Sequence, residues 1–65
     1  MSVKHCIDNF INGNLSDARR QARRYSSRTL HDRLREDYNY SFDKAYFTVH
    51  YLKTGDGFQK ACDCL

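Results

Sequence analysis

The stretch "SFDKAYFTVHYLKTGDG", residues 41–57, carries a helical pattern with its own start and stop signals. Ser41 can cap the start, because its side-chain oxygen can accept a hydrogen bond from a backbone N–H of the first turn. The "KTGDG" segment supplies a glycine of the kind that commonly ends a helix. Between these signals the apolar residues recur at spacings of three and four, which is typical of one helical face. The predicted inward face consists of Phe42, Ala45, Tyr46, Val49 and Leu52.

Two more aromatic residues of this segment, Phe47 and Tyr51, fall one turn apart on the opposite face of the predicted helix. A helix that is apolar on both sides is usually packed between neighbours, and the first and last helices of the chain would then cover this face. The alternative is an exposed aromatic patch that marks a homodimer or a partner interface. Phe47 and Tyr51 are therefore a candidate second interface.

Two helices are predicted in the first third of the chain. Gly13 can adopt the left-handed conformation that ends the first of them. Asn14 can then cap the second, with Asp17 in its first turn beside the positive end of the helix dipole. The apolar face of the first helix consists of Val3, Cys6, Ile7, Phe10 and Ile11, and that of the second of Leu15, Ala18, Ala22 and Tyr25.

The two remaining helices flank the central one. Thr29, followed three residues later by Asp32, resembles a capping box at the start of a third helix. Asn39 is a candidate left-handed residue after its end. Asp56, followed three residues later by Gln59, can cap a short final helix. The apolar residues are Leu30, Leu34 and Tyr38 in the third helix, and Phe58, Ala61, Cys62 and Leu65 in the last.

The joints between these segments are only two to four residues long, so consecutive helices are expected to lie against one another. The chain has no proline and only three glycines among its 65 residues, which suits short helices better than a sheet with many turns. We predict an all-α fold, a compact bundle of four to five short helices. Residues 1–65 are expected to form a single helical domain.

Charge is distributed unevenly along the sequence. Residues 15–35 hold seven arginines and two aspartates, whereas residues 36–65 hold three lysines and five acidic residues. On the second helix, four arginines fall on the side away from the predicted core, and one more follows in the next segment. The candidate partner-binding face therefore consists of Arg19, Arg20, Arg23, Arg24 and Arg28.

Three interpretations of this arginine face stay open. It can be a solvated helix surface, partly neutralised by Asp32, Glu36 and Asp37. It can bind an acidic protein surface, because guanidinium groups pair well with carboxylates. It can also bind the phosphates of DNA or RNA, but the acidic second half would repel a phosphate backbone, and aromatic residues for base stacking are sparse near the arginines.

The cysteines and histidines suggest two further hypotheses. Three cysteines and a histidine, namely Cys6, Cys62, Cys64 and His5, could in principle fill a tetrahedral zinc site, but their spacing does not match zinc motifs. Cys6 and Cys62 fall on apolar faces, which favours small buried side chains. We therefore expect no metal and no other cofactor.

A catalytic pair of Cys6 or Cys64 with His31 or His50 is the second of these hypotheses. Nothing in the spacing brings these residues together, and the chain is too short to enclose a typical substrate pocket as a monomer. The chain is therefore expected not to be an enzyme, with His31 and His50 at the surface or at its boundary. No apolar run is long enough to span a membrane, no signal peptide follows Met1, and the odd number of cysteines argues against a disulfide framework. These features favour the cytoplasm.

Three phrases, "NFINGNLSDARRQAR" at residues 9–23, "LREDYNYSFDKA" at residues 34–45 and "YLKTGDGFQKACD" at residues 51–63, resemble a group of small bacteriophage-encoded proteins of about this length. The resemblance covers the chain from Phe10 to Asp63 and carries no catalytic motif. It implies a viral accessory protein that acts inside a bacterium. Such a protein would bind and modulate, most simply inhibit, a host protein or nucleoprotein complex, for example defence machinery such as CRISPR complexes. The alternative is a small basic protein that binds DNA or RNA.

Overall fold

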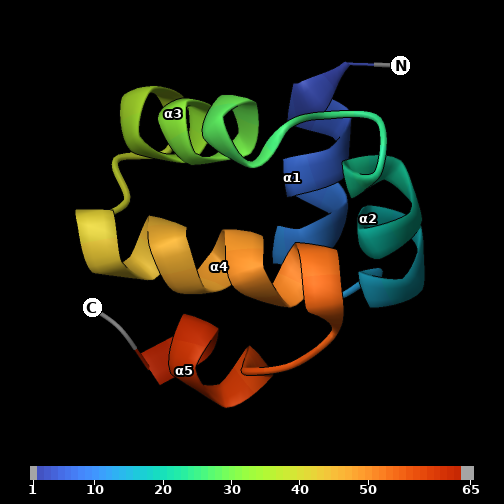
Figure 1. Ribbon diagram of the computed structural model, residues 1–65. Coiled ribbons are helices and arrows are strands. Elements are labelled where there is room, and N and C mark those ends of the chain that lie inside the picture. Colours follow the sequence, from blue (N-terminus) through green and yellow to red (C-terminus); the bar gives the residue numbers. More distant parts are fainter. Residues whose placement is uncertain (1, 64–65) are drawn as a thin grey trace.

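Five helices lie within residues 2–63, which are the residues that the computed structural model describes (Figure 1). In this part of the chain there is no strand, so the prediction of an all-α bundle is confirmed. None of these helices is both long enough and apolar enough to cross a membrane. The helices are α1 (Val3–Ile11), α2 (Leu15–Ala22), α3 (Ser27–Asp37), α4 (Phe42–Thr54) and α5 (Phe58–Asp63).

Local signals set most of the helix boundaries. Ser41 precedes α4, and its Oγ accepts a hydrogen bond from the Lys44 N–H at 3.2 Å, as predicted. Gly13 follows α1 and Gly55 ends α4, both in the left-handed region at φ 85°. Asn39 has a φ of 57° and turns the chain between α3 and α4. Each of these residues was predicted from its type and its place in the pattern.

Three predicted caps differ in the structure. Ser26 caps α3 by accepting from the Thr29 N–H at 3.1 Å, so the helix begins two residues before Thr29 and includes Arg28 in its first turn. Asn14 stands at the start of α2, but its side chain donates to Asn9 Oδ1 at 3.3 Å instead of capping the helix. Gln59 donates to the Asp63 carboxylate at 3.0 Å, one turn ahead, and does not pair with Asp56.

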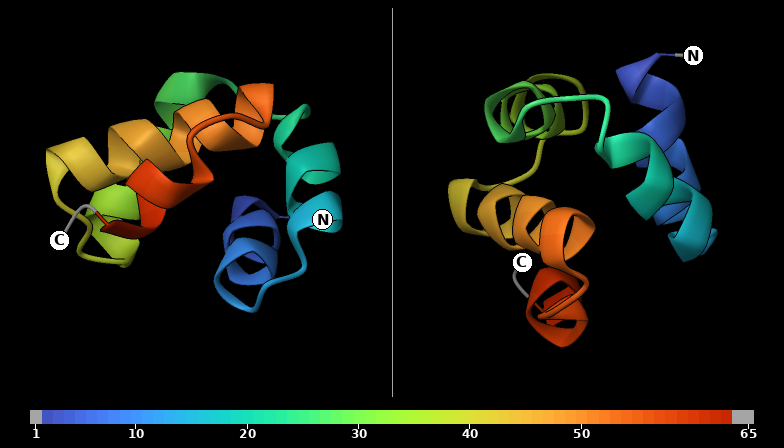
Figure 2. Two further views of the ribbon diagram at one scale, coloured as in Figure 1. Left: turned by 90° about the horizontal axis from the view of Figure 1, so that it is seen from below. Right: turned by 45° about the vertical axis from the view of Figure 1, so that its right-hand side comes forward.

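The helices form two groups that meet at α4. α1 and α2 run antiparallel as one pair, and α3, α4 and α5 lie in three successive layers beside it (Figures 1 and 2). α4 packs against α2, α3 and α5 and is the central helix. α2 and α3 are consecutive but are not among the extensively packed pairs, because α2 packs against α1 and α4 instead. The expectation that all consecutive helices lie against one another is therefore wrong at this joint.

The core lies between α4 and the helices around it, and most of the predicted inward residues are buried there. Four predicted core residues are exposed instead: Ile11, Phe42, Tyr46 and Phe58 have exposed fractions of 51%, 57%, 56% and 41%. Cys62 is also exposed, since its neighbour Ala61 takes the inward position on α5. The predicted core residue Leu65 lies outside the described residues. The buried apolar residues are Val3, Cys6, Ile7, Phe10, Ala18, Ala22, Leu30, Leu34, Ala45, Val49, Tyr51, Leu52 and Ala61.

A polar contact ties the end of α3 to α1. Tyr38 Oη donates to Asp8 Oδ1 at 2.8 Å, and Lys4 Nζ donates to Asp8 Oδ2 at 2.7 Å. The hydrogen bonds from Lys4 and Tyr38 lower the pKa of Asp8. Burial, together with the hydrogen bond to Asp8, raises the pKa of Tyr38 to about 12. The pair therefore holds one proton, on Tyr38, over a wide range of pH.

Removing this proton donor by Tyr38→Phe is expected to lower the free energy of unfolding by about 1 kcal/mol at neutral pH. Because the folded pKa of Asp8 lies below its ordinary value of 3.8, the contribution of Asp8 is present above that pH and is lost as the pH falls through the folded pKa. Because the pKa of Tyr38 is raised from 10, its contribution is present below pH 10 and is lost towards pH 12.

Urea unfolding followed by circular dichroism in acidic, neutral and alkaline buffers measures both effects. Tyr38→Phe should bring the largest loss of stability at neutral pH and a smaller one at either extreme. An unchanged pH profile in this variant would show that the contact between Tyr38 and Asp8 does not contribute to stability.

Candidate binding surface at the α2–α3 turn and the α3–α4 groove

The first arginine of the predicted face, Arg19, is a packing residue. Its guanidinium carbon lies 5.9 Å from the centre of the Tyr51 ring, and the side chain is half-buried between α2 and α4. The guanidinium group also lies so close to Gly55 that a Cβ there would be 2.6 Å from Nη2. Arg19 therefore fills space beside the core and does not belong to the exposed arginine face.

Two of the other arginines pair with acids on their own helices. Arg20 Nη2 lies 2.6 Å from Asp17 Oδ1, and both side chains are more than half exposed. Arg28 Nε lies 3.7 Å from Asp32 Oδ2, and its side chain is 90% exposed. Ion pairs as exposed as these stabilise a helix by less than about 1 kcal/mol, so a partner could replace either acid at little cost.

Arg23 and Arg24 are exposed and form no ion pair with any of the described residues 2–63. α2 ends at Ala22, and these two residues follow it in the turn that leads to α3. The sequence placed Arg23 and Arg24 on the second helix, whereas in the structure they lie beyond its end. Two unpaired guanidinium groups at this position can bind an anionic group of another molecule.

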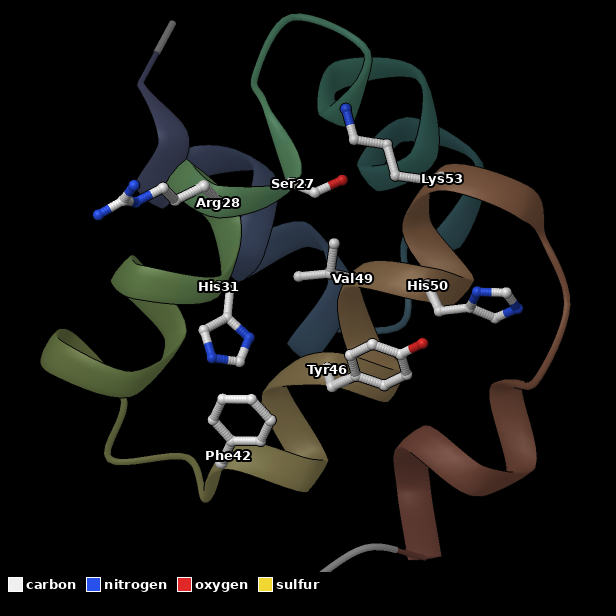
Figure 3. Close-up of a pocket in the computed structure, with 8 residues that line it drawn as sticks. All are labelled: Ser27, Arg28, His31, Phe42, Tyr46, Val49, His50 and Lys53. Atoms are coloured by element: carbon white, nitrogen blue, oxygen red, sulfur yellow. The ribbon is translucent and has the colours of Figure 1, made fainter.

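Lys53 of α4 holds this turn in place. Its ammonium group donates to the backbone carbonyl of Ala22 at 2.8 Å and also to that of Tyr25, so it contacts the chain on both sides of Arg23 and Arg24. A cation is favourable at this position because the carbonyl end of a helix carries partial negative charge. Figure 3 shows the Lys53 side chain extending from α4 towards this turn. We call Arg23, Arg24, Arg28 and Lys53 the cationic edge.

Beside the cationic edge, α3 and α4 enclose an open groove of about 390 Å³ (Figure 3). Clefts that bind ligands commonly measure about 300–1,000 Å³. Its walls are formed by Arg28 and His31 from α3 and by Phe42, Tyr46, Val49 and Lys53 from α4. Because Arg28 and Lys53 line the groove as well, the cationic edge and the groove form one continuous surface. We call this groove the aromatic groove.

The rings in the aromatic groove are ordered by contacts with one another and with basic side chains. His31 packs edge to face with Phe42, with ring centres 4.9 Å apart. The Arg35 guanidinium lies 5.4 Å from the centre of the Phe42 ring and covers one of its faces. Tyr46 packs edge to face with Phe47, and their ring centres are 5.4 Å apart. The exposed parts of Phe42 and Tyr46 thus form preformed apolar walls.

Two of the three histidines, His31 and His50, belong to this surface. His31 is half-buried, and its Nε2 atom is buried without a hydrogen-bond partner among the described residues. His50 is exposed and also lines the aromatic groove. Their predicted positions at the surface or its boundary are confirmed.

The candidate second interface of Phe47 and Tyr51 is not an exposed patch. Tyr51 is 7% exposed, and its ring packs against Phe10 of α1 and Phe58 of α5, with ring centres 5.9 Å and 5.2 Å apart. Phe47 is half-buried, and Lys60 of α5 lies 5.1 Å from its ring centre. α1 and α5 therefore cover this face of α4. This agrees with the prediction that the first and last helices cover Phe47 and Tyr51, and not with the alternative of an exposed aromatic patch.

The residues proposed for zinc or for catalysis are not brought together in the described part of the chain. Cys6 is fully buried, and its thiol donates to the Ala18 carbonyl at 3.2 Å. Burial raises the pKa of this thiol. Cys6 thus lies in the contact between α1 and α2, whereas His31 and His50 line the aromatic groove. Within residues 2–63 no group of three or more potential ligands could hold a metal ion, and Cys64 lies outside them.

A second groove of about 320 Å³ lies between the α1–α2 turn and α5. It includes the exposed side chains of Ile11, Phe58 and Cys62. Lys44 is its one basic residue, and its ammonium group lies 4.3 Å from the centre of the Tyr40 ring. This groove is apolar and is lined by one basic residue, whereas the aromatic groove is lined by both Arg28 and Lys53.

Sequence reasoning missed Lys53, Phe42 and Tyr46 as functional residues. Phe42 and Tyr46 have the spacing of core residues, and only the position of α3 shows that they line a groove. A lysine in the last turn of a helix is typical and gives no hint that it binds another helix. Comparisons with models of protein families, with curated proteins and with solved structures found no match. The resemblance to small phage proteins therefore stays a prediction.

Proposed function

We propose that this chain is a non-enzymatic binding protein whose cationic edge engages an acidic surface of another protein. The observation that carries the proposal is the position of Arg23 and Arg24. Both are exposed, neither has an ion-pair partner among residues 2–63, and Lys53 fixes the turn that carries them. A fixed turn reduces the conformational entropy that binding would otherwise cost.

The partner of first choice follows from the resemblance to phage proteins. In that setting the acidic surface belongs to a protein or nucleoprotein complex in the host cytoplasm, such as defence machinery, and binding inhibits it. Arginine-rich surfaces are well suited to this role, because arginine is enriched among the residues that dominate binding energy at interfaces.

Single-stranded nucleic acid is the second candidate. The exposed rings of Phe42 and Tyr46 beside basic side chains are the kind of arrangement on which bases stack. One observation favours a protein instead. Arg35 already covers one face of the Phe42 ring, which leaves less of that ring free for a base to stack on.

The test reverses the charge of the two unpaired arginines. Arg23→Glu combined with Arg24→Glu is expected to reduce capture of the partner from a bacterial lysate by about tenfold or more. Because both side chains are exposed, the helical circular-dichroism spectrum should not change. Arg23→Gln with Arg24→Gln should act in the same direction without placing negative charge at the end of α2.

The matched control is Arg33→Glu combined with Lys60→Glu, which changes the net charge equally at two basic residues outside both the predicted arginine face and the cationic edge. This control should retain capture. Equal loss in both double variants would mean that overall charge alone governs binding. Loss of capture after nuclease treatment, together with a salt-dependent gel shift of single-stranded DNA or RNA, would favour the nucleic-acid candidate.

A further inference from the structure

We infer that the aromatic groove between α3 and α4 is the specificity pocket of this surface, and that it takes one large apolar side chain from an acidic polypeptide segment. This inference rests on the proposed function, since it names the segment that the cationic edge would bind. The occupant is a protein segment in which a phenylalanine or leucine is flanked by glutamates or aspartates.

The shape and lining of the groove fit an apolar anchor. Val49 contributes aliphatic surface, and Phe42 and Tyr46, both more than half exposed, form its walls on α4. Exposed aromatic side chains grouped in a hollow are typical of interaction sites. A side chain inserted here would contact apolar atoms on several sides, and the area that it buries would stabilise the complex.

The charges around the groove determine what flanks the anchor. Lys53 stands at its α2 end and holds the turn that carries Arg23 and Arg24. Arg28 lines the groove on α3, with its guanidinium group pointing away from Lys53 (Figure 3), and His50 lines it on α4. The acidic residue paired with Arg28 is Asp32, and the distance between Arg28 Nε and Asp32 Oδ2 is 3.7 Å, which is long for an ion pair. A segment whose anchor enters the groove thus places its neighbouring residues against basic groups. Carboxylates at those positions would form charge-assisted hydrogen bonds with arginine.

The contacts within the groove favour a side chain over a nucleic-acid base. A base needs a free ring face for stacking, and Arg35 occupies one face of the Phe42 ring while His31 packs 4.9 Å from its centre. An aliphatic or aromatic side chain needs only apolar surface. The second groove, near α5, offers comparable apolar surface but lacks a cationic edge, so it serves as the internal comparison.

The experiment uses synthetic peptides and the full chain labelled with ¹⁵N. The probes are acetyl-EEFEE-amide, the anchorless acetyl-EESEE-amide and the charge-reversed acetyl-KKFKK-amide. In two-dimensional NMR titrations, EEFEE should shift the amide signals of Phe42, Tyr46 and His31. Its affinity should exceed that of EESEE by roughly tenfold, the gain expected from partial burial of one ring. KKFKK should bind more weakly than either.

Variants of the chain separate the groove from the cationic edge. Tyr46→Ala or Phe42→Ala should remove most of the difference between EEFEE and EESEE. Ile11→Ala, an equally exposed apolar residue at the second groove, should leave it unchanged. Arg23→Glu with Arg24→Glu should weaken both acidic peptides together.

Each failure has a distinct meaning. If EESEE binds as tightly as EEFEE, and both bind less in the arginine variant, the groove inference is wrong and the proposed function stands. If the arginine variant binds both peptides as the unmodified chain does, the proposed function fails. If KKFKK matches EEFEE, or oligo(dT) shifts the groove signals at lower concentration than EEFEE, the acidic segment is the wrong occupant.

Discussion

Leu34→Ala is expected to lower the free energy of unfolding by about 2–5 kcal/mol, because it leaves a cavity in the centre of the fold. Leu34 is fully buried on α3, which packs against both α4 and α1. A chain of this length has a total stability of roughly 3–10 kcal/mol, so the variant would lose a large part of it. In a thermal melt followed by circular dichroism, the Tm should fall by roughly 10–30 °C.

The control for this prediction is Ile11→Ala. Ile11 also lies on a predicted apolar face but is 51% exposed, so its truncation should change stability by less than about 0.5–1 kcal/mol. Comparable losses in the two variants would mean that the α3 layer contributes no more to stability than an exposed side chain, contrary to the structure.

The helices could be predicted from the sequence because their signals are local. Ser41, Gly55 and Asn39 each act within a few residues of their own position, and the spacing of apolar residues identifies the inward face of α1 and much of that of α4. The start of α3 was harder to place. Three hydroxyl residues, Ser26, Ser27 and Thr29, lie within four positions there. Ser26 caps the helix because its Oγ reaches the Thr29 N–H, which leaves Thr29 inside the helix.

The candidate site could be predicted only in part, because it depends on contacts between helices. The sequence drew attention to the arginines around α2, and their role in binding stays a prediction. It could not show that Arg19 packs on Tyr51 of α4, because a helical wheel describes one helix without its neighbours. It also could not show that Lys53 reaches across from α4 to the carbonyls at the end of α2. In the structure Arg19 packs against α4, Arg20 and Arg28 pair with aspartates, and Arg23 and Arg24 are exposed without an ion pair among the described residues. The aromatic groove, which Arg28 also lines, was not predicted.

Gly55→Ala is expected to lower the free energy of unfolding by about 1.5–3 kcal/mol. Gly55 has a φ of 85°, and the left-handed conformation costs a residue with a Cβ roughly 1–2 kcal/mol. In addition, the new Cβ would lie 2.6 Å from Arg19 Nη2, so the guanidinium must move away from Tyr51. The loss of this cation–π contact adds about 0.5–1 kcal/mol. Urea unfolding monitored by circular dichroism measures the sum.

Gly13→Ala separates the two parts of this effect. Gly13 has the same φ of 85°, but a Cβ there would meet no atom within 4 Å, so its replacement costs the backbone conformation alone. The excess loss in Gly55→Ala should therefore measure the displacement of Arg19. In an Arg19→Ala background the excess should vanish, because the side chain that the Cβ would displace is absent. Equal losses for the two glycines in the unmodified chain would show that Arg19 does not pack against the end of α4, and would return it to the exposed arginines available to a partner.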